Sequence, residues 1–500
     1  MIERYANGKN NAIWSDKAKL QKWQDVELAV ILAKEQMVKF PIGTYEKIKS
    51  ILDLHPIDDE AVKWWKARDK EINHDLNAFI DERLRHLPPE LHQYWHKGMT
   101  SYDTEEPAMA LLLHESWQLI ENHYLEIKRL LFDLAKRYRY TPMLGRTHGQ
   151  EAKLQSFGKR CLTWLKPLQI SYSLLLDAAN LAAQSKLSGA IGNYQGLTPK
   201  EEAKALGILG LKPYIGATQI MPRIVYIPMA NALELMVASL TQIAEDIRLG
   251  ARSGNPIMQE PFGKKQKGSS AMPHKKNTIT CEQMIGMLTA ARNFAQMLRE
   301  RVMTWEERAI EQSCVERIAW PDIFHVVMQS YKNMIKVLSG LQVFQDNMLQ
   351  EIIFSRGCYA SEDAKDWLKE RMAEFGLTHE DAYRMVQVAS FLAHSVTSKR
   401  KEIREAKFDS FDEAQDILDH HQSDIIPEAD DITSIKYFIE LADLRPLPEL
   451  DIDQVQVDAW NEVLGKIFEL PENQQSWDQL FTITYQLRGE AAIFEAFGIK

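Results

Sequence analysis

Residues 233–247 read Leu-Glu-Leu-Met-Val-Ala-Ser-Leu-Thr-Gln-Ile-Ala-Glu-Asp-Ile, and their apolar side chains return at steps of three and four. This spacing places them on one face of an α-helix, whereas polar residues such as Glu234 and Arg248 fall on the opposite face. A stripe of this kind is typical of a helical bundle or a coiled coil. We therefore predict that a long helix begins after Pro228 and buries this stripe.

Two further stretches carry the same period. No proline interrupts residues 108–141, and apolar side chains repeat there at helical spacing, at Ile120, Tyr124, Ile127, Leu131 and Leu134. A third stripe runs from Met284 through Leu298 to Val302. Helices of this length span roughly 40 Å or more at about 1.5 Å per residue. One chain can hardly cover such stripes, so we predict an all-α fold whose central bundle combines helices from several subunits.

The chain divides by composition into three helical parts. Residues 1–106 contain short helices and polar loops, residues 107–355 hold the long stripes of the central bundle, and residues 356–500 form a C-terminal helical domain. After about residue 400 the composition becomes acidic and proline appears more often, so we expect a peripheral extension there.

Composition excludes several classes of function. The 500 residues are 45% hydrophobic and 26% charged, with a net charge of -10, which argues against general binding to nucleic acid. No run of about 18 apolar residues predicts a membrane span, and the N-terminus lacks the apolar core of a signal peptide. Because the four cysteines are widely spaced, we expect a reducing compartment, the cytoplasm.

The segment Gly268-Ser269-Ser270-Ala271-Met272-Pro273-His274-Lys275-Lys276-Asn277 stands apart from the helical pattern. Three lysines precede it in residues 263–267, so the local field suits an anionic ligand. A serine in this field has the surroundings that a catalytic base needs, with Lys275 and Asn277 as holders of a substrate carboxylate. His148 and His74 are candidate acids. The alternative is a mobile surface loop without chemistry.

Cofactor chemistry has no support in the motifs. Gly263 and Gly268 have the spacing of a phosphate-binding loop, but Ser269 stands where that loop requires lysine. The sequence contains no dinucleotide-binding glycine pattern behind a strand and no Cys/His spacing typical of a metal site. We therefore expect catalysis without a cofactor or a metal.

Residues 268–277 resemble the signature loop of the fumarase/aspartase superfamily, whose members eliminate fumarate or a close analogue from a substituted succinate. Further similar segments occur in the family's order: 3–5, 73–75, 98–103, 145–150, 188–194, 218–219, 307–308 and 316–317. The resemblance covers about residues 1–390. It implies a helical N-terminal domain, a long central bundle and a helical C-terminal domain, in a homotetramer that builds each site from several subunits.

The resemblance also implies roles for individual residues. Ser269 would be the base that removes a proton from carbon, and His148 the acid that protonates the leaving nitrogen, with His74 as its partner. The residues that match carboxylate-binding or other substrate-binding positions are Asn73, Asp75, Thr100, Ser101, Gln219, Ser270, Lys275 and Asn277. Those that match positions for a nucleotide's phosphate are Arg4, Tyr5, Arg308, Ser313 and Arg317. His96 is a nearby candidate for which a structural role stays open.

The expected activity is therefore that of a carbon–nitrogen lyase, which releases fumarate from a small succinyl nucleotide of purine synthesis. Departures from the family pattern at Thr278, Gln283 and Ala309–Cys314 leave two alternatives open. One is a superfamily lyase that acts on another succinyl compound, such as argininosuccinate. The other is an oligomeric helical scaffold without activity.

Overall fold

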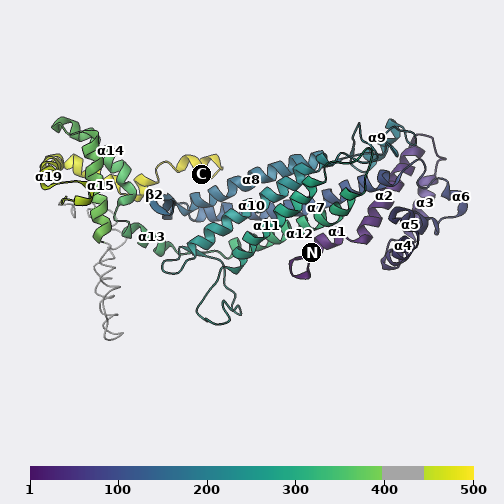
Figure 1. The fold of residues 1–500 in the computed structure, drawn as a ribbon, viewed down its shortest axis with the longest axis horizontal. Helices are drawn as coiled ribbons and strands as arrows, with labels where there is room; N and C mark the ends of the chain where they lie inside the picture. The colour runs from purple at the N-terminus through teal and green to yellow at the C-terminus, as the bar shows by residue number, and fades with distance from the viewer. Residues whose placement is uncertain (397–443, 500) are drawn as a thin grey trace. The chain divides into compact units, whose positions relative to one another are not determined.

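The computed structural model describes residues 1–396 and 444–499 and separates into two compact units (Figure 1). Unit 1 comprises Met1–Leu130, Trp164–Gly250 and Gln259–Leu341, and unit 2 comprises Leu131–Thr163, Ala251–Met258 and the described part of Gln342–Lys500. Helices dominate both units, and the sheets among the described residues are pairs of short strands. The predicted all-α class is therefore confirmed. The division into three domains stays a prediction, and the acidic stretch of residues 400–443 lies outside the described residues.

The elements follow one another in this order: η1 (Glu3–Tyr5), α1 (Gly8–Ile13), α2 (Asp16–Gln36), α3 (Thr44–Asp53), α4 (Asp59–Ile72), α5 (Asp75–Leu84), α6 (Pro89–His92), α7 (Ser101–Arg137), β1 (Pro142–Thr147), β2 (Gln150–Ser156), α8 (Phe157–Ala182), β3 (Gln184–Ser185), α9 (Pro199–Ile208), β4 (Lys212–Pro213), η2 (Arg223–Val225), α10 (Ile227–Gly250), β5 (Met258–Gln259), α11 (Ile279–Glu300), α12 (Glu311–Ser339), β6 (Gln342–Val343), α13 (Gln345–Phe354), η3 (Cys358–Ala360), α14 (Ser361–Met372), η4 (Ala373–Phe375), α15 (His379–Val396), η6 (Pro448–Leu450), α19 (Gln454–Phe468), α20 (Pro471–Leu480), α21 (Ile483–Gln486) and α22 (Ala491–Ala496).

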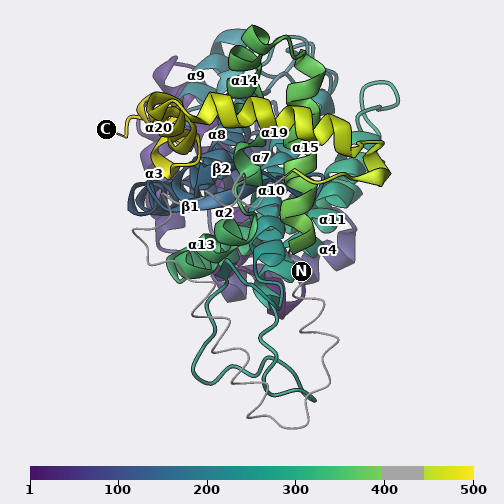
Figure 2. The same ribbon diagram turned by 90° about the vertical axis from the view of Figure 1, so that its left-hand side faces the viewer.

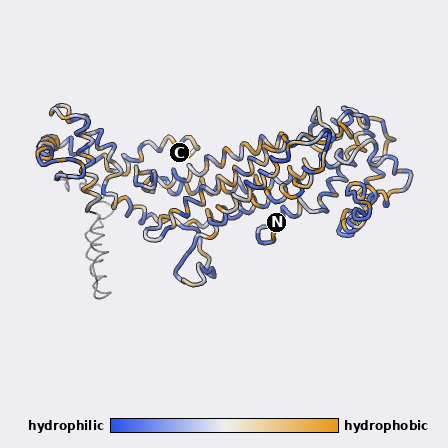
Figure 3. The backbone as a smooth tube through the Cα atoms, in the orientation of Figure 1, coloured by the Kyte–Doolittle hydropathy of each residue, from blue (hydrophilic) through white to orange (hydrophobic). Residues whose placement is uncertain are grey.

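The predicted stripe of α10 is the core of the bundle in unit 1. α10 packs against α11 and α12. The residues of the stripe are fully buried: Leu233, Met236, Val237, Leu240, Ile243, Ala244 and Ile247. The Trp164 indole of α8 donates to Asp246 of α10 at 2.7 Å, and the Tyr124 ring of α7 stacks on Tyr172 of α8 at 3.8 Å. The five helices α7, α8, α10, α11 and α12 lie side by side in Figure 1. Figure 3 shows apolar residues distributed along each of them. Residues 223–250 also have the length and composition of a membrane span, but most of their apolar side chains pack inside this bundle.

The long helices have the expected scale. α7 contains 37 residues, which corresponds to about 55 Å at about 1.5 Å per residue. The third stripe ends sooner than the sequence pattern indicates, because α11 stops at Glu300 and leaves Val302 in the connection to α12.

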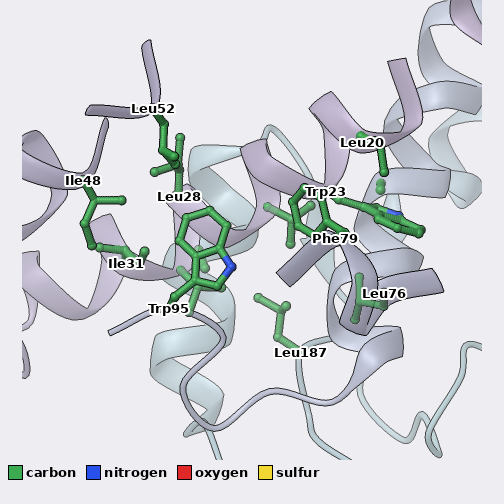
Figure 4. Packing of buried hydrophobic residues seen from close by; sticks show 14 of the residues in the cluster. Leu20, Trp23, Leu28, Ile31, Ile48, Leu52, Leu76, Phe79, Trp95 and Leu187 are labelled. Atoms are coloured by element: carbon green, nitrogen blue, oxygen red, sulfur yellow. The ribbon is translucent and has the colours of Figure 1, made fainter. Parts of the chain in front are cut away.

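A second core of unit 1 lies among α2 to α5 (Figure 4). Trp23 makes edge contacts with Trp65 at 6.4 Å and with Phe79 at 5.5 Å, and Leu187 joins the same cluster from the segment after α8. Each large side chain buried here stabilises the fold by about 2–3 kcal/mol. The cluster therefore fixes the N-terminal end of α5 and the segment that leads into α7.

Unit 2 holds a β-hairpin where the sequence pattern predicts only a turn between helices. β1 and β2 pair antiparallel, from Pro142 opposite Ser156 to Thr147 opposite Gln150. The hairpin packs against α13. Four further helices of unit 2, α14, α15, α19 and α20, are seen in Figure 2. They pack around a core that includes Trp367, Trp460 and Trp477.

Candidate active site

A charged cluster forms where the N-terminal ends of α5 and α7 meet α12. The Arg317 Nη2 atom lies 2.8 Å from Asp75 Oδ2 and 3.8 Å from Glu105 Oε2. Burial and the neighbouring Asp75 carboxylate raise the pKa of Glu105 to about 7, although Arg317, Arg308 and Lys19 oppose the shift. Two of the predicted residues, Asp75 and Arg317, are therefore in direct contact.

Arg308 and Gln219 form a second predicted pair. The Arg308 guanidinium donates to Gln219 Oε1 at 3.0 Å and lies over the ring of Tyr102 at 4.1 Å from its centroid. Thr218 Oγ1 donates to the backbone carbonyl of Glu307 at 2.8 Å. These contacts fix the segment that carries Arg308 against the loop before η2, and they orient its cationic side chain by stacking.

A cavity of about 230 Å³ lies among α2, α7, α12 and η2. Its wall combines aromatic and apolar side chains with charged ones, and the polar part comprises Asp16, Lys19, Glu105, Glu106, Arg223, Ser313, Glu316 and Arg317. The Ser313 hydroxyl donates to the Ile310 carbonyl at 2.9 Å and remains able to accept. A guanidinium, an amine and a hydroxyl on one cavity are the groups that bind a phosphate.

A fully buried ion pair organises the segments that are predicted to bind carboxylates. Lys186 Nζ lies 2.7 Å from Asp103 Oδ1, and both side chains are fully buried. The other Asp103 oxygen accepts from the Thr100 N–H at 2.9 Å, and Lys186 Nζ also donates to the Gln219 carbonyl at 2.9 Å. The pair therefore ties Thr100 and the start of α7 to the segment of Gln219.

Close backbone contacts reinforce this arrangement. A Cβ atom on Gly98 would lie 2.6 Å from the Gly196 carbonyl oxygen, and one on Gly192 would lie 1.9 Å from the carbonyl oxygen of Ala217. Only glycine permits such approaches.

Sequence reasoning missed Lys186 and Asp103. Asp103 carried a signal, because it follows Thr100 at the spacing of a helix cap, whereas nothing in the sequence marked Lys186.

A second buried network lies beside the cavity. Arg223 pairs with Glu106 of α7 and lies 3.2 Å from both Glu316 carboxylate oxygens, and Tyr226 Oη donates to Glu106 at 3.0 Å. Burial raises the pKa of Glu316 to about 7, and Glu106 adds to this, while Arg223 opposes it. Because Glu316 precedes Arg317, the network fixes the first turns of α12.

The loop of residues 263–277 has its own internal order. Asn277 Nδ2 donates to the Gly268 carbonyl at 2.9 Å, and a Cβ on Gly268 would lie 1.7 Å from the Lys275 carbonyl oxygen. Ser269 Oγ accepts from two backbone N–H groups, those of Ala271 at 3.3 Å and Met272 at 3.1 Å. The two ends of the loop therefore meet at Gly268. The Ser269 Oγ atom is surrounded by backbone N–H donors.

The loop is exposed and stays separate from the charged cluster. Ser270 and Lys275 are exposed, and the loop projects from the bundle as a largely hydrophilic segment in Figure 3. Within residues 1–396 and 444–499, no hydrogen bond or ion pair joins residues 263–277 to Asp75, Arg308 or Arg317. The structure thus places Ser313 and Arg317 on one cavity, whereas no such contact joins the predicted base to this cluster.

The predicted acid belongs to unit 2. His148 is exposed at the tip of the hairpin, where it has φ 54° and is followed by Gly149 with φ 78°. Positive φ angles at both central residues are those of a type I′ turn, which suits the twist of a two-stranded hairpin. The side chain of His148 therefore sits on a defined turn.

His74 caps helix α5. Its Nδ1 atom accepts from the Asn77 N–H at 3.2 Å, so in the neutral ring the proton is on Nε2. Asn73, in the left-handed region at φ 52°, ends α4 directly before it. Among the residues that the structure describes, His74 Nε2 has no hydrogen-bond partner, so it can donate to a ligand. Asp75 follows it as the partner of Arg317.

His96 has a structural position. Its Nδ1 atom lies 2.7 Å from Oε1 of the buried Glu27, whose other oxygen accepts from the His96 N–H. Burial lowers the pKa of His96, but the charge of Glu27 and its hydrogen bond prevail and raise it. Thr104 donates to the same carboxylate at 2.7 Å. This network anchors α7 to α2.

The N-terminal arm lies along α12, the helix that carries Ser313 and Arg317. η1 packs against α12, and the Asn7 N–H donates to His325 Nδ1 at 3.0 Å. Arg4 is exposed and Tyr5 is half-buried. The arm is thus held on the helix that carries two further predicted phosphate ligands, Ser313 and Arg317.

Comparison with known proteins gives a consistent result. Residues 11–292 match the model of a family described as lyase. The chain is 34% identical over 387 residues to adenylosuccinate lyase of Thermotoga maritima, covering 77% of this chain and 87% of the relative. It is 30% identical over 482 residues to adenylosuccinate lyase of Pyrococcus horikoshii, covering 94% of this chain and 97% of the relative.

Solved structures share the fold. A fumarate lyase from Mesorhizobium sp. BNC1 superposes with a TM-score of 0.70 at 20% identity, covering 92% of this chain and 98% of that one. The 3-carboxy-cis,cis-muconate lactonizing enzyme from Pseudomonas putida gives a TM-score of 0.73 at 20% identity, covering 99% of this chain and 96% of that one. At this identity the likeness concerns the fold alone.

Proposed function

The chain belongs to the lyase family that includes the adenylosuccinate lyases, and from this premise we propose that it eliminates fumarate from adenylosuccinate to give AMP. We include a second elimination, from the succinylated aminoimidazole carboxamide ribotide of purine synthesis. The observation that carries the choice of a nucleotide is the cavity with Ser313 and Arg317, near the stacked Arg308. Neither fumarate nor argininosuccinate carries a phosphate, so neither requires this pairing of guanidinium and hydroxyl groups.

In the proposed reaction Ser269 acts as the base. Its Oγ removes a proton from the succinyl carbon next to the one that bears nitrogen, and the two backbone N–H groups directed at Oγ stabilise the alkoxide form. Negative charge then develops on the neighbouring carboxylate, which Ser270, Lys275 and Asn277 would hold. Thr100 and Ser101, at the start of α7, would hold the second carboxylate.

The carbon–nitrogen bond breaks in the second step. Its electron pair passes to the leaving nitrogen, and His148 supplies the proton that this nitrogen requires. His74 is the proposed partner of His148, and its free Nε2–H suits such a contact. Gln219 and Asn73 would position the substrate, and Arg4 and Tyr5 would add to the phosphate site.

We infer that the working form is a homotetramer in the cytoplasm with sites shared between subunits. The bundle helices support this proposal, since apolar side chains of α8 and α10 remain exposed on one copy: Ile170, Leu174, Leu235 and Leu249. Exposed apolar residues in such number on long helices are typical of an interface. The proposed base on unit 1 and the proposed acid on unit 2 would then come from different copies.

The direct test is to follow nucleotide absorbance while the purified protein acts on adenylosuccinate. Arg317→Met should raise KM about 10–100-fold, because a charged hydrogen bond contributes about 1.5–3 kcal/mol. Arg292→Met changes an exposed cation on α11 that pairs with Glu234, and it should leave KM unchanged. Absence of turnover in an intact oligomer would refute the proposal. Turnover of argininosuccinate, with KM indifferent to Arg317, would favour the other superfamily activity.

A further inference from the structure

One guanidinium of the charged cluster serves two carboxylates. Asp75 makes the close contact with Arg317 at 2.8 Å, and Glu105 lies farther away at 3.8 Å. The Glu105 side chain is only 15% exposed, whereas that of Arg317 is 56% exposed and accessible to a ligand. Glu105 is therefore a loosely paired carboxyl in the wall of the cavity.

Binding of a phosphate at Arg317 changes the charge balance around Glu105. The groups that act on Glu105 are Asp75 at the start of α5, Lys19 on α2, Arg308 before α12 and Arg317 on α12, with Tyr102 on its own helix. The other charged residues on the wall of the cavity are Asp16, Glu106, Arg223 and Glu316. A phosphate dianion adds two negative charges to a cavity that Asp16, Glu105, Glu106 and Glu316 line, and whose Arg317 already contacts Asp75. Repulsion in a partly buried site is strong, so the loosely paired carboxyl is the one that gains a proton from solvent.

We propose that Glu105 is an affinity-determining residue of the phosphate site, which takes up a proton when a phosphorylated ligand binds at Arg317. The inference rests on the proposed function. In its neutral form Glu105 no longer repels the phosphate and becomes a hydrogen-bond donor to it. In its ionised form it competes with the ligand for Arg317.

The raised pKa of Glu105 in the ligand-free protein supports this role. The pKa of Glu105 is raised to about 7 by burial and by Asp75, so the carboxyl changes its charge in the range where the phosphate is already mostly dianionic. A carboxyl that is half protonated near neutral pH takes up a fraction of a proton on binding, up to about one as pH rises. Affinity for AMP should therefore fall about tenfold from about pH 7 to about pH 8.5 through this group.

The experiment measures AMP binding by titration calorimetry at several pH values, in buffers of different ionisation enthalpy. The native protein should take up a proton on binding and lose affinity as pH rises. Glu105→Gln should bind AMP without this uptake, with an affinity nearly independent of pH above the phosphate pKa. Glu126→Gln, at an exposed position of the same helix, should behave as the native protein does. Circular dichroism checks that each variant is folded, and Glu105→Asp should retain the proton uptake.

Equal proton uptake in the native protein and in Glu105→Gln would overturn the inference while the proposed function stands. A native protein that splits adenylosuccinate but binds AMP without proton uptake would do the same. If AMP does not bind the native protein, the phosphate site and the inference fail together. Failure of turnover as well then marks the loss of the proposed function itself.

Discussion

Replacing Arg223 by methionine should produce a loss of stability that depends on pH. The side chains of Arg223 and Glu106 are 4% and 1% exposed, and Glu316 shares the same guanidinium at 3.2 Å. Removing one partner of a buried ion pair costs about 3–5 kcal/mol, because it leaves a charge without compensation. In the variant the buried carboxyls can avoid this cost only by remaining protonated.

The direction in which stability changes with pH follows from that protonation. A carboxyl whose folded-state pKa is raised, as that of Glu316 already is, contributes stability at low pH that is lost as pH rises through the folded-state value. Keeping one glutamate neutral against an unfolded pKa of about 4.3 becomes costlier by about 1.4 kcal/mol per pH unit. Arg223→Met should therefore lose roughly 4 kcal/mol more at about pH 8 than at about pH 5, which are three pH units apart.

Urea unfolding followed by far-ultraviolet circular dichroism measures this difference. Arg223→Lys retains the charge and should lose less at about pH 8. Adding Glu106→Gln and Glu316→Gln to Arg223→Met removes the charges that need a partner and should restore much of the stability at high pH. An equal loss at both pH values, or a triple variant no more stable than Arg223→Met at high pH, would refute this account of the network.

Three further predictions concern the loop and the His96 network. Ser269→Ala should reduce turnover of adenylosuccinate about 10²–10⁴-fold while AMP binding and circular dichroism stay native, because only the proton-accepting oxygen is removed. Gly268→Ala should reduce turnover with the fold retained, since its Cβ would lie 1.7 Å from the Lys275 carbonyl oxygen and displace the loop. Because the pKa of His96 is raised, its pair with Glu27 should add stability that is present below about pH 6.5 and lost as pH rises through the raised value. Melting temperatures of the native protein and Glu27→Gln over this range measure that term.

Each of the three can be contradicted. Undiminished turnover in Ser269→Ala would exclude this residue as the base. A Gly268→Ala variant with native rates would show that the close approach to Lys275 is not required for activity. If the melting temperatures of the native protein and of Glu27→Gln change with pH in parallel, the His96–Glu27 pair does not contribute a pH-dependent stabilisation.

The architecture was predictable where the signal is local. The spacing of apolar residues from Leu233 to Ile247 was enough to predict which face of the helix is buried. This prediction does not require the partner helix to be identified, because the period is a property of one segment. The hairpin around His148 was missed, since residues 142–156 are short and polar at the tip and read equally well as a turn. The break after Glu300 was missed as well, because no proline or glycine marks it.

The site was predictable only in part. Asp75, Gln219, Arg308 and Arg317 were named from the resemblance, and the structure places them in contacting pairs. The buried pairs that hold them in place join residues far apart in the chain, such as Lys186 with Asp103. A charged residue of this kind looks like any solvated one until its partner is known.

The fully buried Lys186 also provides a chemical probe of local unfolding in the core. Its amine is enclosed by Asp103 and by the carbonyl oxygens of Gly189 and Gln219, whereas Lys264, Lys265 and Lys275 are exposed. An amine-reactive reagent will therefore label the loop lysines at once and Lys186 only in molecules whose core has locally unfolded. Peptide mass spectrometry of the labelled protein then measures local opening at this one position, inside the region that orders the segments predicted to bind carboxylates.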